Sequence, residues 1–123
     1  MKAISYIPSD AYAAGEMKHG PIALLDESTP VIAVATDSPV VEKILSNMEE
    51  VRARGADVIA IATEGSEKVG EVADQTLFVP HTDWILQPIV AIVPLQLLAY
   101  YVAREKGLNV DQPRNLAKTV TVE

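Results

Sequence analysis

Two short apolar runs, residues 31–35 (VIAVA) and 58–62 (VIAIA), constrain the fold of this chain more than any other feature of its sequence. Each run is continuous and rich in β-branched residues, which is typical of strands covered on both faces of a parallel sheet. Between them, residues 40–51 place apolar side chains at helical spacing. Strand, helix and strand within about thirty residues form a βαβ unit, so we expect neighbouring parallel strands with a right-handed crossover.

The helix of this unit has sequence signals at both of its ends. Residues 36–39 supply a capping residue followed by Pro39, which is favoured at the first helical position. At the other end, Arg52 and Arg54 face the negative end of the helix dipole, and Gly55 is suited to the left-handed cap conformation. The helix is therefore expected to begin at Pro39 and to end before Gly55.

Further elements are expected after the second strand. Residues 64–73 are polar and predict a short helix, residues 76–79 predict a third strand, and residues 84–106 predict a long helix closed by Gly107. Thr82 or Asp83 is expected to cap that helix, and Pro94 in its interior is expected to bend it.

The segment before residue 31 is expected to be loop-rich, because it has little periodicity and is interrupted by Gly15, Gly20 and Pro21. A doubly wound sheet normally opens with a strand and a helix. We therefore expect one α/β domain over the 123 residues, with a mainly parallel sheet flanked by helices and incomplete at its N-terminal side. Residues 109–123 are expected to form an extended tail that other surfaces must order.

Composition excludes several classes of function. A formal charge of -7 argues against nucleic acid as a partner, and the absence of cysteine excludes disulfides and thiolate chemistry. The N-terminus does not read as a signal peptide, so a cytoplasmic location is expected. Residues 85–103 are apolar, but Gln87 and Gln96 would each carry an amide into hydrocarbon, so a buried helix and no membrane span are predicted.

Few residues suggest chemistry when the spacing alone is considered. His19 lies in a segment constrained by two glycines and a proline, and its imidazole is either a general acid/base or a surface side chain. His81 follows a strand and is interpreted as a surface histidine, and two histidines do not predict a metal site. Lys118 reads as a solvated lysine unless its surroundings desolvate it or place it near other cations.

Three blocks of sequence carry a family resemblance: AYAAGEMKHGP (residues 11–21), PLQLLAY (94–100) and DQPRNLAKTVTVE (111–123). In this order they closely resemble the glutamine:fructose-6-phosphate aminotransferase (glucosamine-6-phosphate synthase) family. The resemblance implies a three-layer sugar isomerase (SIS) fold, with residues 1–123 as the second, C-terminal SIS domain, truncated at its start. It implies an enzyme that converts fructose 6-phosphate and glutamine into glucosamine 6-phosphate for amino-sugar and UDP-N-acetylglucosamine synthesis.

The same resemblance implies roles for particular residues. Lys118, in the tail of residues 109–123, matches the family lysine that forms a Schiff base with the ketose, and Ala117 lies against the sugar. His19 matches the histidine that assists ring opening in the site of a neighbouring subunit, which implies a homo-oligomer. A sugar phosphate is the implied ligand, and no metal or organic cofactor is implied.

Two departures from the family pattern bear on activity. The first is that the 123 residues include neither the glutaminase domain nor the first SIS domain, whose Ser/Thr loop holds the phosphate in the family. Second, the family reads Lys-Glu-Ile-Ser-Tyr where this chain reads KAISY, so Ala3 stands in place of the glutamate that moves hydrogen between the first two sugar carbons. We therefore expect a part of the isomerase domain that is inactive alone. The alternative is a stand-alone, non-catalytic SIS module that binds a sugar phosphate or a partner protein. Bare apolar sheet surface also predicts self-association.

Overall fold

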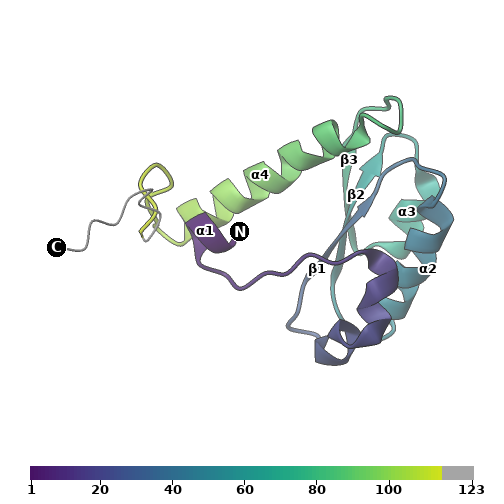
Figure 1. The fold of residues 1–123 in the computed structure, drawn as a ribbon, viewed down its shortest axis with the longest axis horizontal. Coiled ribbons are helices and arrows are strands. Elements are labelled where there is room, and N and C mark those ends of the chain that lie inside the picture. Colours follow the sequence, from purple (N-terminus) through teal and green to yellow (C-terminus); the bar gives the residue numbers. More distant parts are fainter. Residues whose placement is uncertain (115–123) are drawn as a thin grey trace. The chain divides into compact units, whose positions relative to one another are not determined.

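The computed structural model describes residues 1–114, which divide into two compact units (Figure 1). The sheet unit comprises residues 12–94, and the terminal unit comprises residues 1–11 together with the described residues from 95 onward. In chain order the elements are α1 (Lys2–Ser5), the 3₁₀ helices η1 (Ala14–His19) and η2 (Pro21–Leu24), β1 (Val31–Ala35), α2 (Val41–Arg52), β2 (Val58–Thr63), α3 (Glu67–Val72), β3 (Gln75–Val79) and α4 (Gln87–Glu105). The α4 helix contributes residues to both units.

The three strands form one parallel sheet in the order β1-β2-β3. Val31 pairs with Val58 and Ala35 with Ala62, so the two apolar runs lie side by side along their whole length. The β3 strand pairs with the other edge of β2, from Gln75 opposite Ile59 onward. The predicted parallel α/β sheet, with neighbouring strands and a crossover helix, is confirmed.

The main core lies between one face of this sheet and the helices α2 and α3, which pack on the same side (Figure 1). On this face, β1 and β2 each begin with a valine and continue with alanines, and these small residues allow the helices to approach the sheet closely. Leu45, Met48 and Val51 of α2 and Val69 of α3 fill the space above them, which is the apolar stripe that the helical spacing predicted. The sheet residues of the cluster are Val31, Ala33, Ala35, Val58, Ala60 and Ala62.

The opposite face of the sheet is also apolar but is covered less evenly. Strand alternation places Val34, Ile61 and Leu77 on this face. Ile61 at the centre is 1% exposed, whereas Val34 is 42% and Leu77 is 45% exposed. Apolar surface of this kind is what the expected self-association would cover.

The start of α2 differs from the prediction. The helix begins at Val41 and not at Pro39, and no side chain caps it. Ser38 and Pro39 instead belong to a turn in which the Val41 amide donates to the Ser38 carbonyl at 3.2 Å. The predicted end is confirmed, because Gly55 has a φ of 87° and closes the turn after Arg52.

The start of the long helix was also predicted too early. Asp83 forms a turn, in which its carboxylate accepts from the Ile85 amide at 3.1 Å and its carbonyl accepts from the Leu86 amide at 2.8 Å. α4 therefore begins three residues later than predicted, at Gln87, and continues through Pro94. Gly107 follows its end with a φ of 68°, as predicted, whereas the bend at Pro94 stays a prediction. Within residues 1–114, no helix combines the length and apolar character that crossing a membrane requires.

The segment before β1 is loop-rich, as predicted, but contains three short helices that have no periodic signal in the sequence. A tight turn ends it: the Asp26 carboxylate accepts from the Ser28 hydroxyl at 2.7 Å, the Thr29 hydroxyl at 2.9 Å and the Ser28 amide at 2.9 Å. These hydrogen bonds, led by that from the Ser28 side chain, lower the pKa of Asp26. The turn directs the chain into β1.

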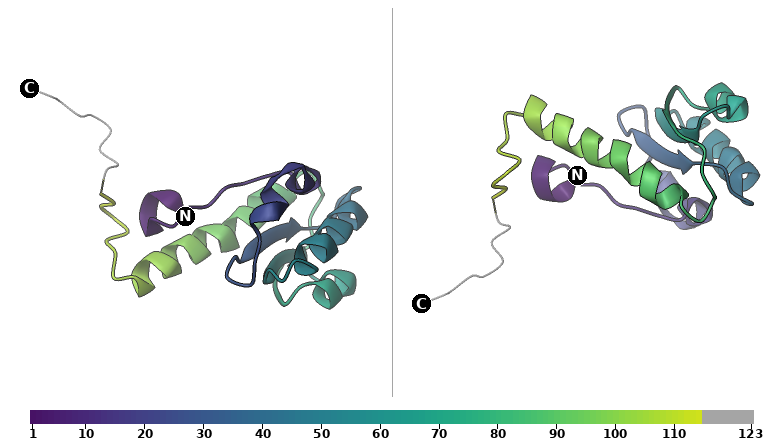
Figure 2. Two further views of the ribbon diagram at one scale, coloured as in Figure 1. Left: turned by 90° about the horizontal axis from the view of Figure 1, so that it is seen from below. Right: turned by 90° about the horizontal axis from the view of Figure 1, so that it is seen from above.

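The terminal unit places α1 beside the C-terminal end of α4 (Figure 2). The Lys106 ammonium donates to the Ser5 carbonyl at 2.7 Å, and Ser5 is fully buried. Residues 109–123 were predicted to form an extended tail, but those described, 109–114, contain bends and a turn. The Asn109 side chain accepts from the amides of Asp111 and Gln112 at 3.0 Å each. Residues 115–123 lie outside the described residues.

Truncation of a strand valine tests which face of the sheet forms the core. Val58→Ala is expected to lower the free energy of unfolding by ~1–3 kcal/mol, because Val58 is fully buried against α2. Val34→Ala is the matched control on the opposite face, where the lost burial is smaller and a loss below about 1 kcal/mol is expected. Urea unfolding of both variants measures this, and equal losses would show that the assignment of the core is wrong.

A second prediction concerns the loop between β1 and α2. The Asp37 amide donates to the Thr63 hydroxyl at 2.9 Å, and Thr63 is fully buried at the end of β2. Thr63→Val removes the acceptor at nearly constant volume, so the free energy of unfolding should fall by ~1–2 kcal/mol. Thr63→Ser keeps the hydroxyl and should lose less. If the serine variant proves the less stable of the two, the hydrogen bond does not hold this loop.

Candidate functional site

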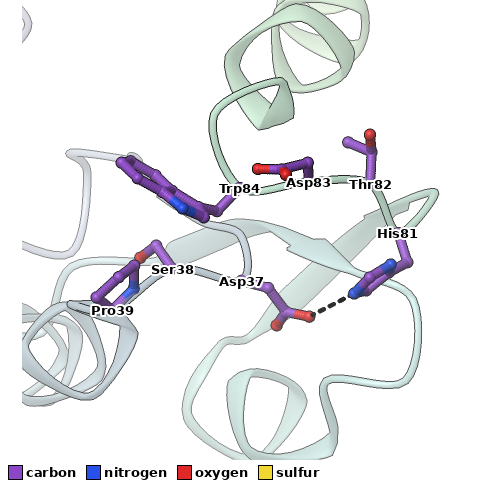
Figure 3. A pocket seen from close by; sticks show the side chains of 7 residues that line it. All are labelled: Asp37, Ser38, Pro39, His81, Thr82, Asp83 and Trp84. Carbon is purple, nitrogen blue, oxygen red and sulfur yellow. Dashed lines mark ion pairs between the residues drawn. The ribbon is translucent and has the colours of Figure 1, made fainter.

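An open pocket lies where the chain leaves β1 and β3, at the carboxyl end of the sheet (Figure 3). Ligands of open α/β sheets bind at this edge, because the loops that follow parallel strands gather there. The pocket has a volume of about 360 Å³. It is lined by two loops, one after each edge strand, through Asp37, Ser38, Pro39, His81, Thr82, Asp83 and Trp84.

Asp37 and His81 face each other across this pocket (Figure 3). His81 Nε2 lies 3.9 Å from Asp37 Oδ2, which is too long for a hydrogen bond, and the pair is ionic only when the imidazole is protonated. The side chains are 75% and 48% exposed, so water screens the attraction and the pair contributes less than about 1 kcal/mol. His81 is an exposed histidine, as the sequence predicted.

The chemistry of the pocket favours hydroxyl or cationic groups over phosphate. Asp37 and Asp83 are carboxylates on opposite loops, and their field would repel an anion. Ser38 and Thr82 add hydroxyls, and the Trp84 indole is 59% exposed beside them. Nearby, the Gln87 amide donates to the Thr82 carbonyl at 3.3 Å, while its buried oxygen has no donor among the described residues. No sequence motif marks Asp37 or Trp84 as site residues, although the rule about strand ends points to both loops.

His19 lies at the end of η1 and is exposed to solvent. Met17, two residues earlier, packs against the core cluster and attaches this 3₁₀ helix to α2. Gly20 then ends the helix with a φ of 147°, a backbone conformation that residues other than glycine rarely adopt. The constraint expected from the glycines is therefore present at Gly20, directly after His19.

The other predicted site residues, Lys118 and Ala117, lie outside the described residues. The structure therefore does not test whether they come together with His19. Ala3 is described: it lies in α1 and is exposed. In residues 1–114, histidine and the acidic residues form no group of three or more with the geometry to hold a metal ion.

Comparison with known proteins finds relatives that carry the same enzyme name. The chain is 61% identical over all 123 residues to the isomerizing glutamine–fructose-6-phosphate aminotransferase of Thermus thermophilus, and 57% identical to that of Gloeobacter violaceus. In each case it spans only 20% of the relative's length. It is therefore similar to about a fifth of these proteins.

A solved structure and a family profile agree on the fold. The C-terminal domain of glucosamine-fructose-6-phosphate aminotransferase from Francisella tularensis matches with a TM-score of 0.83 and 40% identity, covering 90% of this chain and 31% of that chain. The SIS domain profile matches residues 1–105, which include every helix and strand described above. The chain belongs to the SIS domain family.

Proposed function

We propose that this chain is the C-terminal part of the isomerase domain of a glutamine:fructose-6-phosphate aminotransferase. The observation that carries the proposal is 61% identity, without a break in coverage, to a protein of that name. The similarity of the fold to a C-terminal domain of the same enzyme supports it. The reaction would convert fructose 6-phosphate and glutamine into glucosamine 6-phosphate, in the cytoplasm, for UDP-N-acetylglucosamine synthesis.

In this proposal Lys118 is the nucleophile. Its amine attacks the ketone carbon of open-chain fructose 6-phosphate, and loss of water gives a Schiff base. A free lysine is protonated near neutrality, so the surroundings must desolvate the amine or place other cations nearby. Ala117, which precedes it, would lie against the sugar. No metal or organic cofactor takes part in this step.

His19 is proposed as the acid/base group that opens the sugar ring. Ring opening moves a proton from the anomeric hydroxyl to the ring oxygen, and imidazole exchanges protons near neutral pH. An imidazole that is exposed on a constrained 3₁₀ helix is accessible to a second polypeptide. This position supports the idea that His19 acts in the site of a neighbouring subunit.

Ala3 limits the catalytic activity that we propose for the isolated chain. The proposed reaction also moves hydrogen between the first two sugar carbons, and this needs a base within hydrogen-bond reach. The methyl group of Ala3 accepts no proton, and its position in α1 is where the family carries glutamate. We therefore propose that the isolated 123 residues do not turn over sugar phosphate.

Ala3 also favours a second candidate function. A SIS module that binds a sugar phosphate or a partner protein without catalysis needs no base, and loss of the carboxylate would then carry no penalty. The catalytic candidate is preferred because the resemblance includes the tail block of residues 111–123. A module that only binds a ligand does not need the Lys118 nucleophile in that block.

We also propose that copies of the chain associate. In the sheet unit, large apolar side chains are exposed on both β3 and the start of α4. Contact of this apolar surface with water is unfavourable in free energy. Leu77 and Phe78 of β3 are 45% and 54% exposed, and Ile89 of α4 is 66% exposed. A homo-oligomer would bury part of this surface.

A chimaera tests the catalytic proposal. The 123 residues replace the matching segment of the Thermus thermophilus enzyme, with Ala3 either retained or changed by Ala3→Glu. Formation of glucosamine 6-phosphate is expected to be about 10²- to 10⁴-fold faster in the glutamate variant, because a positioned general base contributes that much. Product is measured by coupled assay or by NMR.

Two further variants control this experiment. Ala3→Gln matches glutamate in size but is not a base, so it should stay as slow as the alanine chimaera. Lys118→Arg, combined with Ala3→Glu, should abolish the gain, since guanidinium is not a nucleophile at neutral pH. If every chimaera binds fructose 6-phosphate and none forms product, the catalytic proposal fails and the binding module is the correct function.

A further inference from the structure

Tyr6 has an unusual backbone conformation at the end of α1. Its φ is 54° and its ψ is 29°, in the left-handed region that bulky residues rarely occupy. Within residues 1–114 it is the one residue other than glycine with a positive φ. Such strained conformations persist only where surrounding contacts hold them, and they concentrate at functional sites.

Arg114 makes two separate contacts with this tyrosine. The Arg114 backbone amide donates to the Tyr6 hydroxyl at 2.7 Å. The Arg114 guanidinium carbon lies 4.3 Å from the centre of the Tyr6 ring, which is a close cation–π distance. The main chain of Arg114 therefore binds the Tyr6 hydroxyl, and the side chain of Arg114 packs over the Tyr6 ring.

A second attachment involves the residue before Tyr6. The Lys106 ammonium donates to the carbonyl of Ser5, and the Ser5 hydroxyl donates to the Met1 carbonyl at 2.7 Å. Between Lys106 and Arg114, the Asn109 side chain holds a local turn through the amides of Asp111 and Gln112. All of these residues belong to the terminal unit. The chain after α4 is thus fastened to α1 at two points.

We propose that Tyr6 is a positioning residue that anchors the base of the C-terminal tail to α1 through Arg114. Lys118 follows Arg114 by four residues, and four residues of chain span at most ~14 Å. Anchoring Arg114 therefore fixes the start of the segment that carries Lys118 against α1, the helix that carries position 3. The role of Lys118 rests on the proposed function, whereas the anchor itself does not.

The rate of hydrogen exchange at the Arg114 amide tests the anchor directly, because this amide is the donor to Tyr6. In the purified 123-residue chain, Tyr6→Phe removes the acceptor but keeps the ring, so exchange measured by NMR should quicken by about two- to twelvefold. Tyr6→Ala removes both contacts and should quicken it by a further two- to fivefold. Tyr12→Phe is the matched control and should change nothing, since Tyr12 belongs to the sheet unit.

Chemical shifts and relaxation separate positioning from a general loss of structure. The side-chain protons of Arg114 should show an upfield ring-current shift that survives in Tyr6→Phe and disappears in Tyr6→Ala. Arg114→Lys keeps the positive charge and the backbone amide, so the exchange rate at residue 114 should stay within about threefold of the original. The heteronuclear NOE of the Lys118 amide should fall in Tyr6→Ala, while the thermal midpoint of the sheet unit stays unchanged.

Two results would overturn the proposal. An Arg114 exchange rate that is the same in Tyr6→Phe as in the original chain shows that the hydroxyl does not hold the tail. A Lys118 NOE unaffected by Tyr6→Ala shows that the anchor does not position the lysine. Neither measurement needs sugar or turnover. Failure of Lys118 to act in catalysis would therefore refute the proposed function while leaving the anchor intact.

Discussion

Parallel pairing of β1 with β2 is the constraint on which the remaining structure of the sheet unit depends. Parallel neighbours cannot be joined by a tight turn, so the chain must cross over through α2. The crossover places the apolar stripe of α2 on the alanine-rich face of the sheet and creates the main core. It also brings the ends of the strands to one edge, where the loops after β1 and β3 line the pocket.

Sequence patterns predicted the elements well where burial gives a periodic signal. The two apolar runs, the stripe of α2 and the glycine ends at Gly55 and Gly107 all appear where expected. The starts of α2 and α4 were placed too early, because Ser38 and Asp83 form turns of their own in place of helix caps. α1 was missed, since four residues are too few to show a helical period.

Site geometry was predicted less completely, because it depends on contacts between distant residues. The sequence indicated His81 at a strand end, and the rule about strand ends points to the loop that carries Asp37, but no motif marks Asp37 as the residue that faces His81. The contact between Tyr6 and Arg114 joins residues 108 positions apart, and no local pattern announces it. The proposed roles of His19, Ala117 and Lys118 rest on the family resemblance, because spacing alone does not distinguish a reactive lysine from a solvated one.

A lysine amine becomes reactive only where its surroundings desolvate it or place other cations nearby, and we propose that these 123 residues alone do not supply such surroundings for Lys118. The most direct measurement treats the purified chain with fructose 6-phosphate and borohydride, which reduces any Schiff base to a stable adduct, and then maps the peptides by mass spectrometry. Lys118 is expected to keep its unmodified mass. A mass gain of one reduced hexose phosphate on Lys118 would contradict this proposal.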